Sequence, residues 1–275
     1  MKLMTLNTHS LAEKNYRRKL YEFTVAVAEE KPDIIALQEV NQTRNADTVQ
    51  ISELTNYFSC NEKLLIKKDN HAYNAVKILE KSGISYYWTW LGIKLGYDKY
   101  DEGIALMSRT PITEIFSGTI SRNDSYYNWK TRKILGIKTE KFPNQCFYSV
   151  HLGWWNDNEE PFPQQWERLE NHIEKNNKIW LMGDFNNSAE IKNQGYDMIK
   201  NSGWYDCYNL SENKDSGFTV CKSIDGWKDK KSAENMRIDY IFCNRKIPVK
   251  NYRTVFNNIN YPVVSDHFGI IIETE

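Results

Sequence analysis

Short apolar runs that end abruptly in polar residues are the most regular feature of this chain. In the clearest case, residues 179–182 are apolar and are followed by Gly183-Asp184-Phe185-Asn186. Four apolar residues closed by glycine predict a buried strand whose end allows close approach of a ligand. Residues two apart on a strand point the same way, so we expect Asp184 and Asn186 to face one ligand while Phe185 turns into the core. Taken alone, the same letters also fit an ordinary turn.

The same transition recurs along the chain. Three further apolar runs deliver, in order, Asn7, Glu39 and His151. Glu102 opens another apolar stretch after a Gly- and Tyr-rich segment, residues 91–101, which we expect to be a loop. The repeated appearance of an acid, an amide or a histidine beside a strand favours a ligand site over an ordinary turn.

Periodicity predicts the remaining elements. Helical spacing of apolar residues predicts helices over residues 16–30, around 72–79, from Pro163 onward and over 190–201. Strands are predicted at residues 2–6, 34–37, 85–90, 103–107, 111–116, 131–139, 145–150, 178–182, 237–242, 254–256 and 268–272. Interleaved helices and strands, with strands also in runs, predict an α/β layered sandwich of two packed sheets with helices outside. Without a linker or repeat, residues 1–275 are expected to form a single domain.

Composition narrows the choice of partner and compartment. Lys plus Arg and Asp plus Glu number 36 each, so the formal net charge is zero. No global positive field is therefore available to hold a polyanion such as DNA. The five cysteines are scattered without paired metal-ligand spacing, which suits reduced thiols. With no secretory signal and no segment of membrane-spanning length, we expect a cytoplasmic protein without a membrane partner.

Seven short motifs resemble the endonuclease/exonuclease/phosphatase superfamily, whose members are similar to deoxyribonuclease I, and they occur in that family's order. They are Asn7, Gln38-Glu39, Glu102-Gly103 with Ser108-Arg109, His151, Gly183-Asp184-Phe185-Asn186, Arg237-Ile238-Asp239 and Ser265-Asp266-His267. The resemblance implies a four-layered α/β sandwich with two central, mostly antiparallel sheets and the site at their rim. It also implies divalent-metal-dependent attack of water on a phosphoester.

The resemblance assigns roles to the polar residues. It implies that Glu39 is the metal ligand, that Asn7 is a second ligand or orients one, and that Asp266 completes the site directly or through water. Hard oxygen ligands of this kind suit Mg²⁺, with Mn²⁺ as an alternative. By the same comparison, Asp184 orients or deprotonates the attacking water, and Asn186 donates its amide to a phosphoryl oxygen. Without the resemblance, Glu39 also fits a solvated acid at a strand end.

Two of the five histidines are expected to be catalytic. In the family pattern His151 has Glu102 as its acid partner and His267 has Asp239, and such pairs suit a phosphate clamp or a general acid or base. His9 matches no family position. Arg132 is a candidate phosphate contact, and a solvated cation at a strand end is an equal alternative.

Loop composition indicates the substrate class. The loops that carry the candidate residues are rich in acids and aromatic side chains, which repel a polyanion but suit the hydroxyls and ring faces of a sugar. The candidates for sugar contact are Tyr97, Tyr100, Trp154, Trp155 and Trp227, although some of these tryptophans are expected to pack loops onto the body instead.

Three segments in combination also resemble a branch of the superfamily that includes maltose 6'-phosphate phosphatase. They are Trp88-Thr89-Trp90-Leu91-Gly92, His151-Leu152-Gly153-Trp154-Trp155 and Ile224-Asp225-Gly226-Trp227. We therefore predict a phosphatase acting on a small sugar phosphate. A nuclease, a phospholipid or inositol phosphoesterase, and a non-catalytic binding relative are the alternatives. The complete set of acids and histidines argues against the last of these.

Overall fold

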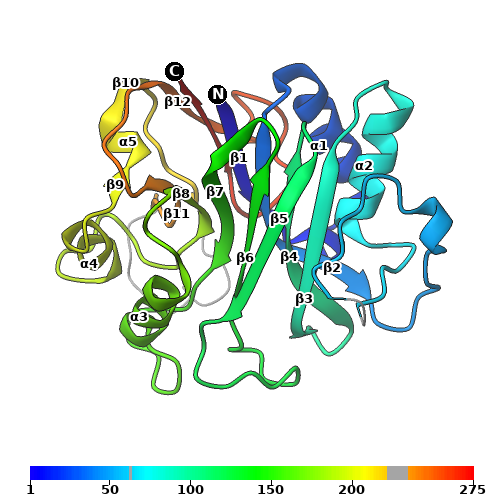
Figure 1. The fold of residues 1–275 in the computed structure, drawn as a ribbon, viewed down its shortest axis with the longest axis horizontal. Helices are drawn as coiled ribbons and strands as arrows, with labels where there is room; N and C mark the ends of the chain where they lie inside the picture. Colours follow the sequence, from blue (N-terminus) through cyan, green and yellow to red (C-terminus); the bar gives the residue numbers. More distant parts are fainter. Residues whose placement is uncertain (62–63, 222–234) are drawn as a thin grey trace.

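The computed structural model describes residues 1–61, 64–221 and 235–275. They form two mixed sheets that pack face to face, with helices on both outer faces (Figure 1). Both sheets are mostly antiparallel, and the parallel pairs are β1 with β2, β10 with β12, and β7 with β8. The predicted α/β sandwich is therefore confirmed.

The first sheet has seven strands in the order β10-β12-β13-β1-β2-β4-β3. Its strands are β1 (Lys2–Asn7), β2 (Ile34–Thr43), β3 (Tyr87–Gly96), β4 (Tyr100–Ser108), β10 (Ser211–Lys214), β12 (Val249–Val255) and β13 (Gly269–Thr274). Its outer face is covered by α1 (Tyr16–Glu30) and α2 (His71–Lys81), which lie together on one side of the sheets in Figure 1. Phe23 and Leu79 of these helices pack with Leu37 of β2 in one apolar cluster.

The second sheet has six strands in the order β5-β6-β7-β8-β11-β9. Its strands are β5 (Ile112–Thr119), β6 (Lys133–Thr139), β7 (Phe142–His151), β8 (Lys178–Asp184), β9 (Tyr205–Asp206) and β11 (Asp239–Cys243). Its outer face is covered by α3 (Phe162–His172) and α4 (Gly195–Asn201), through a cluster that includes Trp166, Leu181 and Ile199. The short elements η1 (Ser10–Ala12), η2 (Ile51–Glu53) and α5 (Cys207–Leu210) connect strands.

A third apolar cluster lies between the two sheets. It joins Ile34 and Ala36 on the first sheet to Phe147 and Trp180 on the second. Alternation explains this arrangement, since Ile34 and Ala36 face the middle layer while Ile35 and Leu37 face the helices. Helices, sheet, sheet and helices are the four layers that the resemblance implied.

Several element boundaries differ from the prediction. The strand predicted at 34–37 continues to Thr43, and the one predicted at 254–256 begins at Val249. Residues 91–101 were expected to be a loop, but β3 continues to Gly96 and β4 begins at Tyr100. Glycines at 92 and 96 suggested a loop because glycine weakens strands. In the fold they give room to large neighbours, since a Cβ at Gly96 would lie 2.6 Å from Oε2 of Glu102. The helix expected over 190–201 begins only at Gly195.

Within the described residues, no helix is long and apolar enough to cross a membrane.

Candidate active site

The registers of the two sheets gather the polar strand ends at one rim. In the first sheet Asn7, the last residue of β1, is opposite Gln38, so Glu39 follows immediately beside it. In the second sheet Asp184, the last residue of β8, is opposite His151 on one side and Asp239 on the other. The recurring pattern of an apolar strand followed by a polar residue thus produces neighbours in space.

Asn7 joins the two sheets at this rim. Its Nδ2 donates to Oε1 of Glu39 at 3.0 Å and to Oδ2 of Asp184 at 3.1 Å. The side chain is buried, so these hydrogen bonds are shielded from water. Asn7 therefore holds two carboxylates at fixed positions, and its role as a metal ligand or as the orienter of one remains a prediction.

Glu39 is the acid that best fits a cation. Its backbone has φ 50°, at the register shift between Leu37 and Val40 that kinks β2. Oε2 of Glu39 is buried, and no group among the described residues donates a hydrogen bond to it. Burial, and then the nearby carboxylates of Glu102 and Asp266, raise the pKa of Glu39. A divalent cation would supply the missing partner and offset this repulsion, so the residues present fit Mg²⁺.

Asp266 lies at the outer edge of the same group. Its side chain is about one-third exposed, and its Oδ1 accepts a hydrogen bond from Oγ of Ser265 at 3.2 Å. Ser265 in turn donates to the backbone oxygen of Asn7 at 2.7 Å, which ties this loop to the end of β1. The expected metal-site role of Asp266 remains a prediction, and its position is consistent with it.

His267 and Asp239 form the predicted acid–imidazole pair. Nδ1 of His267 lies 2.9 Å from Oδ2 of Asp239, and both side chains are buried. Burial alone would lower the pKa of His267, but Asp239 and then Asp184 raise it well above its usual value. Nε2 of His267 lies 3.9 Å from Oδ2 of Asp184. The imidazole is therefore held as a cation beside the end of β8.

The second predicted pair, His151 with Glu102, is not formed. Among the described residues, Glu102 makes its ion pair with Lys94, with Oε1 3.1 Å from Nζ, and Nε2 of His151 lies 3.6 Å from Oδ2 of Asp184. Burial, and then the charges of Arg132 and Lys94, lower the pKa of His151 well below its usual value. The prediction was wrong because Lys94 lies directly across the β3–β4 hairpin from Glu102 and takes its carboxylate.

Asp184 and Asn186 face one site, as predicted, and Phe185 lies fully buried between them. Asn186 has φ 49°, and its backbone N–H donates to Oδ1 of Asp184 at 2.8 Å. Its Nδ2 donates to the backbone oxygen of Leu152 at 3.0 Å. Burial, and then Asp239, raise the pKa of Asp184 to about 7. A carboxylate that binds a proton near neutral pH is suited to accept one from water.

These side chains line a cavity of about 290 Å³. Its walls are formed by His9, Glu39, Lys94, Leu95, Gly96, Tyr97, Glu102, Trp129, Arg132, His151, Trp154, Asp184, Asn186, Asp266 and His267. Asn7 and Asp239 stand directly behind this wall. Three of the candidates for substrate contact, Arg132, Tyr97 and Trp154, thus reach the cavity.

Two other candidates for sugar contact, Tyr100 and Trp155, do not line the cavity. Tyr100 is buried, and its hydroxyl donates to the backbone oxygen of Leu11 at 3.2 Å. Trp155 packs against Phe162 of α3, with 6.3 Å between ring centroids. Tyr100 and Trp155 therefore pack within the protein instead of facing the cavity. For Trp155 this is the alternative that the sequence analysis left open for some of the tryptophans. Trp227 lies outside the described residues.

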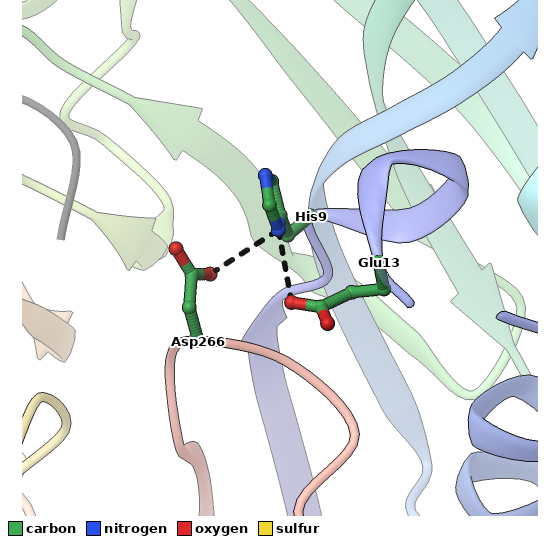
Figure 2. A group of neighbouring side chains, drawn as sticks. All are labelled: His9, Glu13 and Asp266. Atoms are coloured by element: carbon green, nitrogen blue, oxygen red, sulfur yellow. Dashed lines mark hydrogen bonds and ion pairs between the residues drawn. The ribbon is translucent and has the colours of Figure 1, made fainter. Parts of the chain in front are cut away.

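Five wall residues were not among the candidates drawn from the sequence: His9, Lys94, Leu95, Gly96 and Trp129. His9 forms a cluster with Glu13 and Asp266 beside the cavity (Figure 2). Its Nδ1 lies 2.9 Å from Oε1 of Glu13 and 3.9 Å from Oδ1 of Asp266. Burial would lower the pKa of His9, but Glu13 and the other acids raise it to about 9.

In the part of the chain that the structure describes, two groups of three acids or histidines are close enough to hold an ion. They are His9 with Glu13 and Asp266, and Asp184 with Asp239 and His267. In the first, the protonated imidazole of His9 and the ammonium of Lys19, which pairs with Glu13, oppose a cation. In the second, the Asp239–His267 hydrogen bond already occupies two ligand atoms. The free oxygen of Glu39 makes the site beside it the better choice.

Comparison with known proteins agrees with the geometry. Residues 4–267 match the Endonuclease/Exonuclease/phosphatase family. The chain belongs to this family. Membership makes it a phosphoester hydrolase, and the family resemblance drawn from the seven motifs is confirmed. A search of curated protein sequences finds no significant match.

Solved structures of family members share the fold over the full chain. An endonuclease/exonuclease/phosphatase family protein from Leptotrichia buccalis C-1013-b is 33% identical, with TM-score 0.86, covering 100% of this chain and 99% of that chain. A mannosyl-6-phosphatase from Bacteroides thetaiotaomicron VPI-5482 is 19% identical, with TM-score 0.66 and the same coverage. A 3' phosphatase from Neisseria bound to a product DNA hairpin is 16% identical, with TM-score 0.63 and again the same coverage.

Proposed function

We propose that this protein is a Mg²⁺-dependent, cytoplasmic phosphatase that removes phosphate from a small sugar phosphate. The observation that carries the proposal is the composition of the cavity. Acids and three histidines lie next to aromatic rings around a cavity of about 290 Å³, a volume suited to a small ligand. A neutral chain offers no extended positive field for a polymer of phosphates.

Glu39 would hold the metal, with Asp266 directly or through water and Asn7 as orienter. When bound there, Mg²⁺ supplies positive charge that stabilises the phosphoryl oxygens and the attacking water. Manganese would serve the same oxygen ligands.

The chain's own residues provide the remaining chemistry. Asp184, whose pKa is raised to about 7, orients the attacking water and accepts its proton. His267, held as a cation by Asp239, donates a hydrogen bond to a phosphoryl oxygen. His151 and the amide of Asn186 hold the other oxygens of the group.

The sugar would lie against the aromatic wall. Tyr97, Trp129 and Trp154 line the cavity together with carboxylates that accept hydrogen bonds from hydroxyls. Trp227 remains a candidate for the same surface. The mannosyl-6-phosphatase from Bacteroides thetaiotaomicron has the same fold, which is compatible with this reading.

The test is a substrate panel measured in one buffer with Mg²⁺ at physiological salt. It contains maltose 6'-phosphate, other hexose phosphates, an inositol phosphate, a phospholipid, plasmid DNA and RNA. We expect release of inorganic phosphate from a sugar phosphate and no salt-steep cleavage of polynucleotide. Efficient cleavage of DNA or RNA with sugar phosphates left intact would replace the proposal with a nuclease. Turnover of only the lipid or inositol substrate would favour a phospholipid or inositol phosphoesterase.

A further inference from the structure

Two buried cations stand on the same wall of the cavity. The side chains of Lys94 and Arg132 are 6% and 3% exposed. Both are anchored by one carbonyl, since the backbone oxygen of Trp129 accepts from Nζ of Lys94 at 2.7 Å and from Nη1 of Arg132 at 3.4 Å. Their proximity lowers the pKa of Lys94, after burial itself. The two positive charges are therefore held close together and out of water. This arrangement costs free energy unless an anion neutralises them.

The described residues supply only part of the negative charge that would neutralise Lys94 and Arg132. Lys94 has its ion pair with Glu102. Within the described parts of the chain, Arg132 has no ion pair, and its buried Nε has no hydrogen-bond partner. Its guanidinium lies over the ring of Trp154, 5.9 Å from the centroid. Glu102, Asp184 and Glu39 attract Arg132, and Glu102 and Glu39 attract Lys94, but Asp184 and Glu39 are assigned to the attacking water and the metal.

The fold builds this arrangement from regular strand pairing. Lys94 on β3 is opposite Glu102 on β4, and the absence of a side chain at Gly96 leaves room for the Glu102 carboxylate. Arg132 enters from the residue before β6, where its backbone N–H donates to Oγ of Ser121 at 2.9 Å. Lys94 and Arg132 are thus fixed independently of any ligand, which is the preorganisation that charge recognition needs.

We propose that Lys94, together with Arg132, forms an anion subsite that selects the doubly charged phosphate of a monoester over the singly charged phosphate of a diester. This inference rests on the proposed phosphatase function and names Lys94 as its specificity determinant. A dianion gains about twice the Coulomb attraction that a monoanion gains from the same two cations. A diester carries one charge and leaves the pair partly unmatched.

The test compares p-nitrophenyl phosphate with bis(p-nitrophenyl) phosphate, which have the same leaving group. Lys94→Met keeps the length of the side chain and removes its charge. We expect kcat/KM for the monoester to fall by about 10- to 100-fold, the range for one charge-assisted hydrogen bond, and that for the diester by less than about threefold. Lys138→Met is the matched control, because Lys138 is also opposite a glutamate, Glu114, on paired strands but does not line the cavity.

Two further variants separate charge from folding. Lys94→Met combined with Glu102→Gln removes both members of the ion pair and leaves no buried acid unmatched, and it should lose the monoester preference as the single variant does. Lys94→Arg should restore part of it. Binding of inorganic phosphate and of dimethyl phosphate by calorimetry adds a readout without turnover, in which only the former should weaken, by about tenfold.

Equal losses on both substrates, or a double variant with wild-type selectivity, would overturn the role of Lys94. A wild-type protein that cleaves the diester and ignores the monoester would instead refute the proposed function. The calorimetric comparison of Lys94→Met with wild type would then still decide whether Lys94 selects the dianion.

Discussion

Nδ1 of His267 lies 2.9 Å from Oδ2 of Asp239, whereas His151, at the end of β7, has no such partner behind it among the described residues. The two imidazoles therefore differ in charge. Asp239 holds His267 protonated, and burial beside Arg132 and Lys94 keeps His151 neutral. One ring acts as a cation and the other as a neutral hydrogen-bonding group, although the sequence pattern is the same for both.

The Asp239–His267 pair predicts the effect of Asp239→Asn. The amide is the same size but cannot stabilise the imidazolium, so kcat should fall by about 10²- to 10⁴-fold while KM stays within about threefold. Steady-state kinetics on the best monoester from the panel measures both. Asp197→Asn, on α4 in an ion pair with Lys200 at 3.3 Å, is the control and should retain full activity. An unchanged kcat in Asp239→Asn would exclude the pair from catalysis.

Glu39 predicts a link between metal and stability. Glu39→Gln removes a buried charge that neighbouring acids repel, so the metal-free variant should unfold at a temperature no lower than the metal-free wild type. Mg²⁺ at about 100 times its Kd should stabilise the wild type by about 2.7 kcal/mol and the variant by much less. Thermal unfolding with Mg²⁺ and with excess chelator measures this difference.

Activity should follow the same order, with loss of most turnover in Glu39→Gln and in wild type with chelator. Glu167→Gln, at an exposed position of α3, should behave as wild type in both assays. Equal stabilisation of Glu39→Gln and wild type by Mg²⁺ would place the metal elsewhere.

The polar residues that follow apolar runs at this site could be predicted from the sequence for a simple reason. Asp184, Glu39 and Asn7 each follow an apolar run, and the registers of parallel β1 with β2 and of β8 with its neighbours bring such ends together. A change from apolar to polar along one segment is a local signal. The meeting of segments then follows from sheet geometry.

The side-chain partners within the site could not be predicted in this way. The family pattern assigned Glu102 to His151, but the partner is decided by which cation lies nearer in space, and Lys94 lies across the hairpin. Lys94 itself was hidden in a segment whose glycines indicated a loop. Those glycines serve packing, since a Cβ at Gly92 would lie 2.8 Å from the ring of Trp90.

The adjacent tryptophans predict opposite effects. Trp154 lines the cavity, whereas Trp155 packs on Phe162. Trp154→Ala should raise KM for the sugar phosphate about tenfold with little change in kcat, because a stacked face binds substrate and transition state alike. Trp155→Ala should leave KM unchanged and lower the free energy of unfolding by about 2–4 kcal/mol. Kinetics and urea unfolding of both variants test this, and a larger KM effect from Trp155→Ala would reverse the assignment.

Glu30 predicts how stability depends on pH. At the end of α1, its carboxylate accepts from Nζ of Lys2 at 2.9 Å, Nη2 of Arg253 at 2.7 Å and the hydroxyl of Tyr261 at 3.0 Å. Burial alone would raise the pKa of Glu30, but Arg253 and Lys2 lower it below 4.5. A carboxyl group whose pKa is lower in the folded than in the unfolded state stabilises the fold. This contribution is complete above the pKa of the unfolded state and is lost as pH falls through the pKa of the folded state.

Glu30→Gln should therefore lower the free energy of unfolding by about 1–2 kcal/mol at pH 7, the range for hydrogen bonds to a charged, partly exposed group. The difference from wild type should stay constant down to about pH 5 and shrink as pH falls below 4.5. Urea unfolding across this range measures it. Glu22→Gln is the control, because Glu22 on the same helix has a single partner, Arg18, whose side chain is 75% exposed. Its effect should remain under about 0.5 kcal/mol at every pH. A Glu30→Gln difference that grows on acidification would have the wrong sign for this network.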